Sequence, residues 1–172
     1  PEAIKYFQEA IKAYPHDSNI YNSLGRAYYH MGKPEEASKY FQEGVRLDPK
    51  NSKNYIDLAK LYADQGNYPE AIRYFQEAIK ANPRESQAYE GLVKAYFNTA
   101  DYPQAIKYFQ EAIKLNPQNA REYEGLGRVY LVTANYPEAI KYFQEAIRLS
   151  PQEASAYEGL AKAYFNTANY PE

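Results

Sequence analysis

Only one short stretch of this sequence places catalytic residue types side by side. His16, Asp17 and Ser18 are the three side-chain types of a hydrolytic triad. A triad is defined by the geometry of these groups in space and not by adjacency in the chain. The stretch follows Pro15, where Asp17 or Ser18 is well placed to cap the next helix. We therefore expect capping and not catalysis.

The other polar residues form no recognisable metal or phosphate site. His30 has no Cys, His or Asp at ligand spacing. The eight glycines occur singly, so no glycine-rich loop could hold a phosphate. There is no cysteine, which excludes disulfides and thiolate ligands. We expect no enzyme activity, no cofactor and no bound metal.

The bulk composition excludes two further classes of protein. Twenty basic and 22 acidic residues give a formal net charge of −2, which argues against a nucleic-acid binder. No apolar run approaches the ~18 residues of a transmembrane helix, and no secretory signal opens the chain. These features predict a cytoplasmic protein, with a mature secreted protein as the alternative.

A period of 34 residues organises the whole chain. Alanine falls at 3, 37, 71, 105 and 139, and proline at 15, 49, 83, 117 and 151. A fixed period of this length is typical of a solenoid, whose units stack only on their neighbours. The 21 tyrosines fall mostly in a few recurring columns, so we expect them to be packing residues.

Each period contains two apolar stripes. Tyr89 and Leu92 begin a stripe with spacings of three and four, which predicts a first helix. Pro103 suits the first turn of a second helix, whose stripe includes Ala105 and Phe109. Each unit is therefore predicted to be two antiparallel helices of about 12–14 residues.

Eight columns of this pattern carry a family resemblance. They read Tyr55, Leu58, Ala59, Tyr62, Ala71, Phe75, Ala78 and Pro83, and again Tyr123, Leu126, Gly127, Tyr130, Ala139, Phe143, Ala146 and Pro151. Over its whole length the chain resembles the tetratricopeptide repeat family, with tyrosine in place of the common tryptophan. Val93, where a very small residue is usual, and Gly44, where alanine is usual, depart from the pattern.

The resemblance implies an all-α, right-handed α-solenoid, or superhelix, of antiparallel helix pairs. We expect one solenoid over residues 1–172, with about five units in permuted phase. It divides into a half-unit 1–17, units 18–51, 52–85, 86–119 and 120–153, and a half-unit 154–172. The resemblance also implies that the first helices line a concave groove that holds a peptide or helix of a partner.

The expected groove residues are the first-helix positions outside the apolar stripe. They are Asn22, Arg26, Tyr29, Ile56, Lys60, Glu90, Lys94, Phe97, Glu124, Arg128, Leu131, Glu158, Lys162 and Phe165. One column of this set is basic in every unit, and in the last three units a glutamate precedes the base by four residues. These Glu-to-base pairs predict a self-neutralised C-terminal part, with the free positive charge around Arg26. Simple pairing on the helix surface is the alternative to ligand contact.

Large apolar residues three positions beyond the basic column, such as Phe97 and Phe165, accompany glycines at 91, 125 and 159. This combination predicts an apolar shelf beside a shallow recess. Packing against the next unit is the alternative, because apolar residues at helical spacing usually belong to the core.

The phase of the repeat predicts an interaction at the ends. The chain starts with a second helix and stops with a first helix, and no polar capping helix is present. The expected end-to-end contact residues are Ile4, Phe7, Ile11, Tyr157, Leu160 and Tyr164. A segment cut from a longer array is the alternative, and the likeness of the repeats fits recent duplication or consensus design equally well.

Two functions follow from these patterns. The first is a non-enzymatic scaffold that binds a peptide or helix of a protein partner in its concave groove. The alternative is a structural or designed array that associates head-to-tail through its end helices without a specific ligand.

Overall fold

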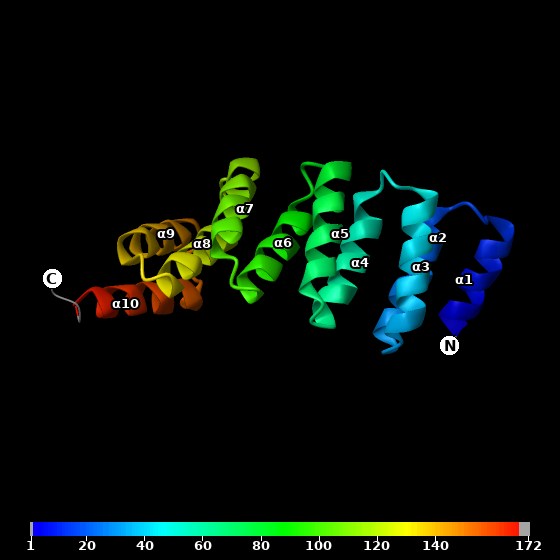
Figure 1. Cartoon of the computed structure of the whole chain (residues 1–172), viewed down its shortest axis with the longest axis horizontal. Coiled ribbons are helices and arrows are strands. Elements are labelled where there is room, and N and C mark those ends of the chain that lie inside the picture. The colour runs from blue at the N-terminus through cyan, green and yellow to red at the C-terminus, as the bar shows by residue number, and fades with distance from the viewer. Residues whose placement is uncertain (1, 169–172) are drawn as a thin grey trace. The chain divides into compact units, whose positions relative to one another are not determined.

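Helices make up the regular secondary structure of residues 2–168, the part of the chain that this computed structural model describes (Figure 1). In chain order they are α1 (Glu2–Ala13), α2 (Ser18–His30), α3 (Pro34–Leu47), α4 (Ser52–Asp64), α5 (Tyr68–Ala81), α6 (Ser86–Asn98), α7 (Tyr102–Leu115), α8 (Ala120–Val132), α9 (Tyr136–Leu149) and α10 (Ala154–Ala168). The chain divides inside α6 into two compact units, residues 1–95 and 96–172.

Within each unit, successive helices pack as antiparallel neighbours. In the first unit α2 packs on α3 and α4 on α5, and α3 also packs on α4 (Figure 1). In the second unit α9 packs on both α8 and α10. Stacked helix pairs of this kind are the arrangement of an α-solenoid, so the predicted all-α solenoid class is confirmed.

Capping residues and prolines set where the helices begin. The carboxylate of Asp17 accepts a hydrogen bond of 2.9 Å from the backbone N–H of Asn19 at the start of α2. This confirms the predicted capping role of Asp17. Helices α3, α5, α7 and α9 carry a proline in the first turn, where its missing N–H removes no helical hydrogen bond.

None of the helices within residues 2–168 combines the length and the apolar character needed to cross a membrane.

A buried phenylalanine on each complete second helix forms the centre of the packing. In the second unit Phe143 is fully buried in a cluster with Ala139 and Ala163, and half-buried Tyr130 and Leu160 pack against it. The phenylalanine ring therefore lies where its own first helix and the next one meet.

Glycines on the first helices allow these rings to approach. A Cβ atom on Gly91 would lie 2.1 Å from the ring of Phe75, and one on Gly159 would lie 2.4 Å from the ring of Phe143. The missing side chains therefore point into the core and not into the groove. The predicted shallow recess beside these glycines is wrong, because phenylalanine rings already fill the space.

Gly44 accepts a hydrogen bond from the neighbouring repeat. Asn54 is buried in α4 and its amide donates a hydrogen bond of 2.9 Å to the carbonyl of Gly44. A Cβ atom on Gly44 would lie 3.4 Å from the Asn54 side chain. Where the Gly44 column has alanine, the Asn54 column has Ile20, Ala88, Glu122 or Ala156. The departure at Gly44 thus accompanies the buried amide of Asn54.

Stacked tyrosine pairs join the two helices of each repeat. The ring centroids lie 5.3 Å apart in Tyr28–Tyr40, 5.5 Å in Tyr62–Tyr74, 5.6 Å in Tyr96–Tyr108 and 5.5 Å in Tyr130–Tyr142. The two planes of each pair are nearly parallel. These tyrosines are packing residues, as predicted.

Raised pKa values of several tyrosines predict that the fold loses stability at alkaline pH. Burial raises the pKa of Tyr28 and Tyr130 above the ordinary value of 10.0, and the hydrogen bond to Asp64 raises the pKa of Tyr29. A group with a raised pKa in the folded chain stabilises the fold fully below its unfolded pKa. That contribution is lost as the pH rises from the unfolded pKa through the folded pKa.

We therefore expect the melting temperature to fall as the pH rises above about 10. Circular dichroism and tyrosinate absorbance, followed together, measure unfolding and deprotonation in one titration. The variant Tyr130→Phe should lose less stability over this range than the wild type, whereas Tyr14→Phe, at an exposed position, should follow the wild type. A melting temperature that is unchanged through the tyrosine titration would contradict the prediction.

Candidate peptide-binding groove

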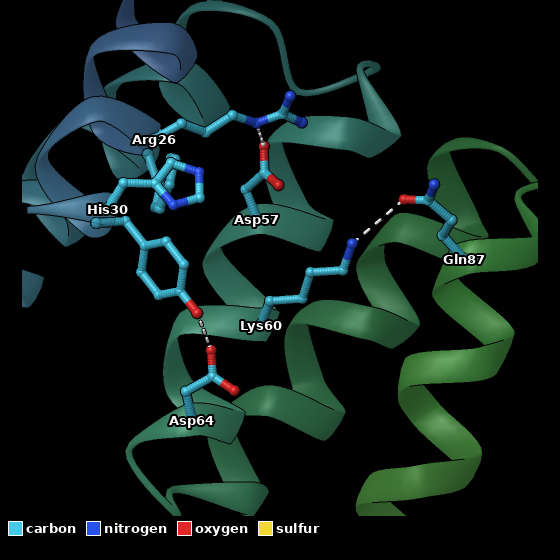
Figure 2. Close-up of a pocket in the computed structure, with 8 residues that line it drawn as sticks. Arg26, His30, Asp57, Lys60, Asp64 and Gln87 are labelled. Atoms are coloured by element: carbon cyan, nitrogen blue, oxygen red, sulfur yellow. Dashed lines mark hydrogen bonds and ion pairs between the residues drawn. The ribbon is translucent and has the colours of Figure 1, made fainter. Parts of the chain in front are cut away.

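The first unit carries a cavity of about 470 Å³ on its first helices. The side chains that line it are Arg26, Tyr29 and His30 from α2, Phe41 from α3, Asp57, Lys60 and Asp64 from α4, and Gln87 from α6 (Figure 2). The α4 residues follow helical spacings of three and four and so share one face of that helix. Charged and polar groups thus surround a small aromatic floor.

Two interactions tie α2 to α4 across this cavity. The Nε of Arg26 donates to Oδ2 of Asp57 at 2.6 Å, and the Tyr29 hydroxyl donates to Oδ2 of Asp64 (Figure 2). The Asp57 side chain is only 10% exposed, so its charge depends on the arginine for compensation. The prediction of free positive charge around Arg26 is therefore wrong for Arg26 itself.

The partner of Arg26 comes from a column that is glycine in the later repeats. Asp57 lies 34 residues before Gly91, which is followed at the same step by Gly125 and Gly159. Gly91 accommodates the Phe75 ring of the preceding helix. At Asp57 the chain instead has a carboxylate, which reaches back to the first helix of the previous repeat.

In the described part of the chain, Lys60 and Lys94 are the members of the basic column that lack a carboxylate partner. The Nζ of Lys60 donates to the amide oxygen of Gln87 at 3.3 Å (Figure 2). Among the described residues, neither lysine has an acidic group within the 4.0 Å of an ion pair. Glu90 therefore does not pair with Lys94, although the Glu-to-Lys spacing predicted that it would.

The second unit contains the two pairs that the sequence predicted. Arg128 lies 3.3 Å from Glu124, and Lys162 lies 2.6 Å from Glu158. The hydrogen bond from Lys162 lowers the pKa of Glu158. The expectation of self-neutralised charge is confirmed for these two repeats.

Two expected groove residues lie in the interior. Asn22 is 7% exposed and Ile56 is 2% exposed. At this column α2 and α4 face the interior of the first unit, where α2 also packs on α4. Asn22 and Ile56 are therefore withdrawn as ligand contacts.

The remaining apolar groove residues have different environments. Tyr29 and Phe165 are exposed, whereas Phe97 is half-buried and lies edge-on to Tyr102. Leu131 packs against the cluster around Phe143. Leu131 therefore belongs to the core, which was the alternative for these positions.

The expected end-contact residues are all at least partly accessible. Ile4, Phe7 and Ile11 are half-buried, and α1 has no buried residue. On α10, Tyr157 and Tyr164 are exposed, whereas Leu160 packs against the Phe143 cluster.

Sequence reasoning missed the contributions of His30 and Gln87 to the cavity, and the pairs made by Asp57 and Asp64. The available signal is the spacing: Arg26 to Asp57 is 31 residues and Tyr29 to Asp64 is 35. Both spacings are close to one repeat, which brings neighbouring first helices together.

Within the described residues, no three His, Cys, Asp or Glu side chains are grouped so that they could hold a metal ion.

Family models match most of the chain. Three models, each described as a tetratricopeptide repeat or TPR repeat, match residues 18–51, 56–120 and 135–167. No curated protein sequence matches the chain significantly.

Solved structures share the fold. A crystal structure of MamA is 26% identical, covers 88% of this chain and 88% of its own, and has a TM-score of 0.80. YrrB, described as a TPR protein with an unusual peptide-binding site, is 20% identical, covers 95% and 84%, and has a TM-score of 0.79. MamA from Desulfovibrio magneticus is 20% identical, covers 89% and 92%, and has a TM-score of 0.74. At 20% identity, the last two comparisons show the fold alone.

Proposed function

Because this chain belongs to the tetratricopeptide repeat family, we propose that it is a non-enzymatic scaffold that binds a peptide or helix of a partner protein along its first helices. The observation that carries this proposal is the cavity of the first unit, which polar and charged side chains line together with the aromatic ring of Phe41. YrrB, a protein of this fold with a peptide-binding site of its own, supports the same class of function. We expect this encounter to take place in the cytoplasm, without nucleic acid or membrane insertion.

Within the cavity, the polar groups divide into fixed and replaceable ones. The charges of Arg26 and Asp57 compensate each other, and Asp57 is largely buried. A ligand that broke this ion pair would leave a buried charge without a partner, which costs free energy. Lys60 is exposed, and within residues 2–168 its side chain is bonded only to the neutral Gln87 amide. An exposed hydrogen bond of this kind contributes little, so a ligand group can replace it.

The first helices of the later repeats offer further contacts. The proposed residues are Glu124, Arg128, Glu158, Lys162 and Phe165, with Glu90, Lys94 and Phe97 on α6. The side chains of Arg128 and Lys162 are exposed in their ion pairs. Ligand carboxylates can therefore compete with Glu124 and Glu158 for these two cations. Lys60 and Lys94 need no such exchange and are the first positions to test.

We expect the double variant Lys60→Glu/Lys94→Glu to bind peptides selected from a displayed library against the wild type about tenfold more weakly, or worse, since tenfold corresponds to about 1.4 kcal/mol. The matched control is Lys39→Glu/Lys114→Glu, which makes the same charge change at exposed positions on the second helices α3 and α7. Fluorescence anisotropy measures affinity and circular dichroism checks folding. Failure to select any peptide, or an equal loss in the control, would count against the groove.

A second candidate function is a structural one, in which copies of the chain assemble into an array without a specific ligand. The observation that favours it is the exposure of large apolar side chains on α1 and α10, including Tyr6, Tyr164 and Phe165. Large exposed apolar side chains can mark interaction surfaces when they gather in one patch. Sedimentation over a concentration series distinguishes this function, because it requires self-association where the groove does not.

A further inference from the structure

Lys60 lines the cavity of the first unit between two carboxylates that it does not bind. Asp57 lies three residues before it on α4 and Asp64 four residues after it, so the three side chains share one face of the helix. Helix α2 engages both carboxylates instead. Arg26 donates to Asp57, and Tyr29 donates to Asp64 (Figure 2). These cross-helix bonds leave the Lys60 cation without an ion pair among the described residues.

The intrahelical partner found in two later repeats is also missing at Lys60. Arg128 and Lys162 each pair with a glutamate four residues earlier on the same helix. The residue four positions before Lys60 is Ile56, which is apolar and 2% exposed. Within residues 2–168, neither α4 itself nor the neighbouring α2 therefore supplies an anion to this lysine.

The group that does meet Lys60 is the neutral side chain of Gln87, which comes from the first turn of α6. Nζ of Lys60 donates to Oε1 of Gln87 at 3.3 Å (Figure 2). Both side chains are exposed, so this bond contributes little net free energy. A glutamine amide carries N–H donors as well as an acceptor oxygen. Gln87 can therefore turn its N–H groups toward an oxygen that takes its place on Lys60.

We propose that Lys60 and Gln87 together bind an acidic side chain of the peptide ligand, and that Gln87 is the residue that sets this preference. This inference rests on the first proposed function and names the chemistry of its ligand. One oxygen of the ligand carboxylate replaces the Gln87 oxygen at Nζ of Lys60, and the other accepts a hydrogen bond from the Gln87 amide. Hydrogen bonds that involve ionised groups are roughly twice as strong as neutral ones, so the exchange favours the bound state.

The charges around the cavity favour a carboxylate over a phosphate. Asp57 and Asp64 line the same cavity, and Arg26 compensates the charge of Asp57. A phosphorylated side chain carries a charge of about −1.5 to −2 at pH 7 and would lie close to both carboxylates. The single charge of an aspartate or glutamate matches the single cation, Lys60, that remains uncommitted. The ligand is therefore a peptide with an aspartate or glutamate at this point.

The first measurement uses the whole 172-residue chain and peptides selected against it from a displayed library. We expect the selected peptides to be enriched in aspartate and glutamate. In the tightest of them, replacing the critical acidic residue by the corresponding amide should weaken binding about tenfold. Fluorescence anisotropy measures both affinities.

Gln87→Glu tests the role of Gln87 itself. The new carboxylate has nearly the size of the amide and pairs with Lys60, so it occupies the cation that the ligand needs. The acidic peptide should bind this variant about tenfold more weakly than the wild type, whereas the amide version should bind the two proteins equally. These four affinities form a double-mutant cycle, which isolates the contact between the ligand carboxylate and this pair of residues.

Gln110→Glu is the matched control. It adds the same charge at an exposed position of α7, on a second helix, and should bind the acidic peptide like the wild type. Circular dichroism establishes that both variants keep their helices. Equal weakening in Gln87→Glu and Gln110→Glu would mean that overall charge is responsible, and would overturn the inference.

The remaining outcomes separate this inference from the function beneath it. If no peptide can be selected against the wild type, both fail. If peptides are selected but show no acidic preference, or if Gln87→Glu binds the acidic peptide as tightly as the wild type, the groove function stands and the inference is overturned. A peptide with phosphoserine at the critical position that binds more tightly than the acidic one overturns the assignment of a carboxylate.

Discussion

Replacing Phe143 with alanine is expected to lower the free energy of unfolding by about 3–5 kcal/mol. The ring is fully buried and fills the space between Gly127 of α8 and Gly159 of α10. Removing it leaves a cavity that the surrounding helices can close only in part. Urea denaturation followed by circular dichroism measures the loss. Phe165→Ala, the same change at an exposed position of α10, should cost far less.

The position of Phe143 also predicts where the damage appears. In a solenoid, stability is approximately the sum of each repeat and its interface with the next. Because the ring contacts both α8 and α10, its loss weakens the interface as well as the repeat. We expect hydrogen exchange in α10 to accelerate more than exchange in α8. Acceleration that is confined to α8 and leaves α10 unchanged would argue against a shared contact.

Gly91→Ala is expected to destabilise the first unit by on the order of 1–2 kcal/mol. The new Cβ atom would lie 2.1 Å from the buried ring of Phe75, and overpacking of this kind costs about 1–3 kcal/mol. Alanine inside a helix stabilises it by about 0.5–1 kcal/mol relative to glycine, which offsets part of this cost. The clash is therefore the larger of the two effects.

Gly44→Ala makes the same chemical change with the opposite expected sign. Its Cβ atom would lie 3.4 Å from Asn54, which is ordinary van der Waals contact. The gain in helix propensity, up to about 1 kcal/mol, should then dominate. Denaturation curves of the two variants and the wild type decide the point. If both variants move in the same direction, close approach of the ring is not what glycine provides at position 91.

The sequence predicted the helices well because their determinants are local and repeated. The apolar spacing, the first-turn prolines and the Asp17 cap each act on residues only a few positions away. The apolar spacing and the prolines also recur from repeat to repeat. The self-neutralised pairs at Arg128 and Lys162 follow the same logic, since both partners lie on one helix turn.

The charge distribution of the first unit could not be predicted in the same way. The partner of Arg26 lies on another helix, and whether the side chains meet depends on how closely α2 and α4 pack. The burial of Asn22 and Ile56 depends on the same packing. Sequence periodicity assigns a residue to a helix face, but the angle at which that face meets its neighbour is a tertiary property.

The cross-helix pairs of the first unit have a consequence for how this array could be rearranged. Arg26, Tyr29 and Gly44 belong to the repeat at 18–51, and their partners Asp57, Asp64 and Asn54 belong to the next. Moving either repeat to another place in the chain would separate three matched pairs, and would leave Asp57 without its counter-charge and Asn54 without its acceptor. Although the repeats share one pattern, these two have a fixed order and cannot be shuffled independently.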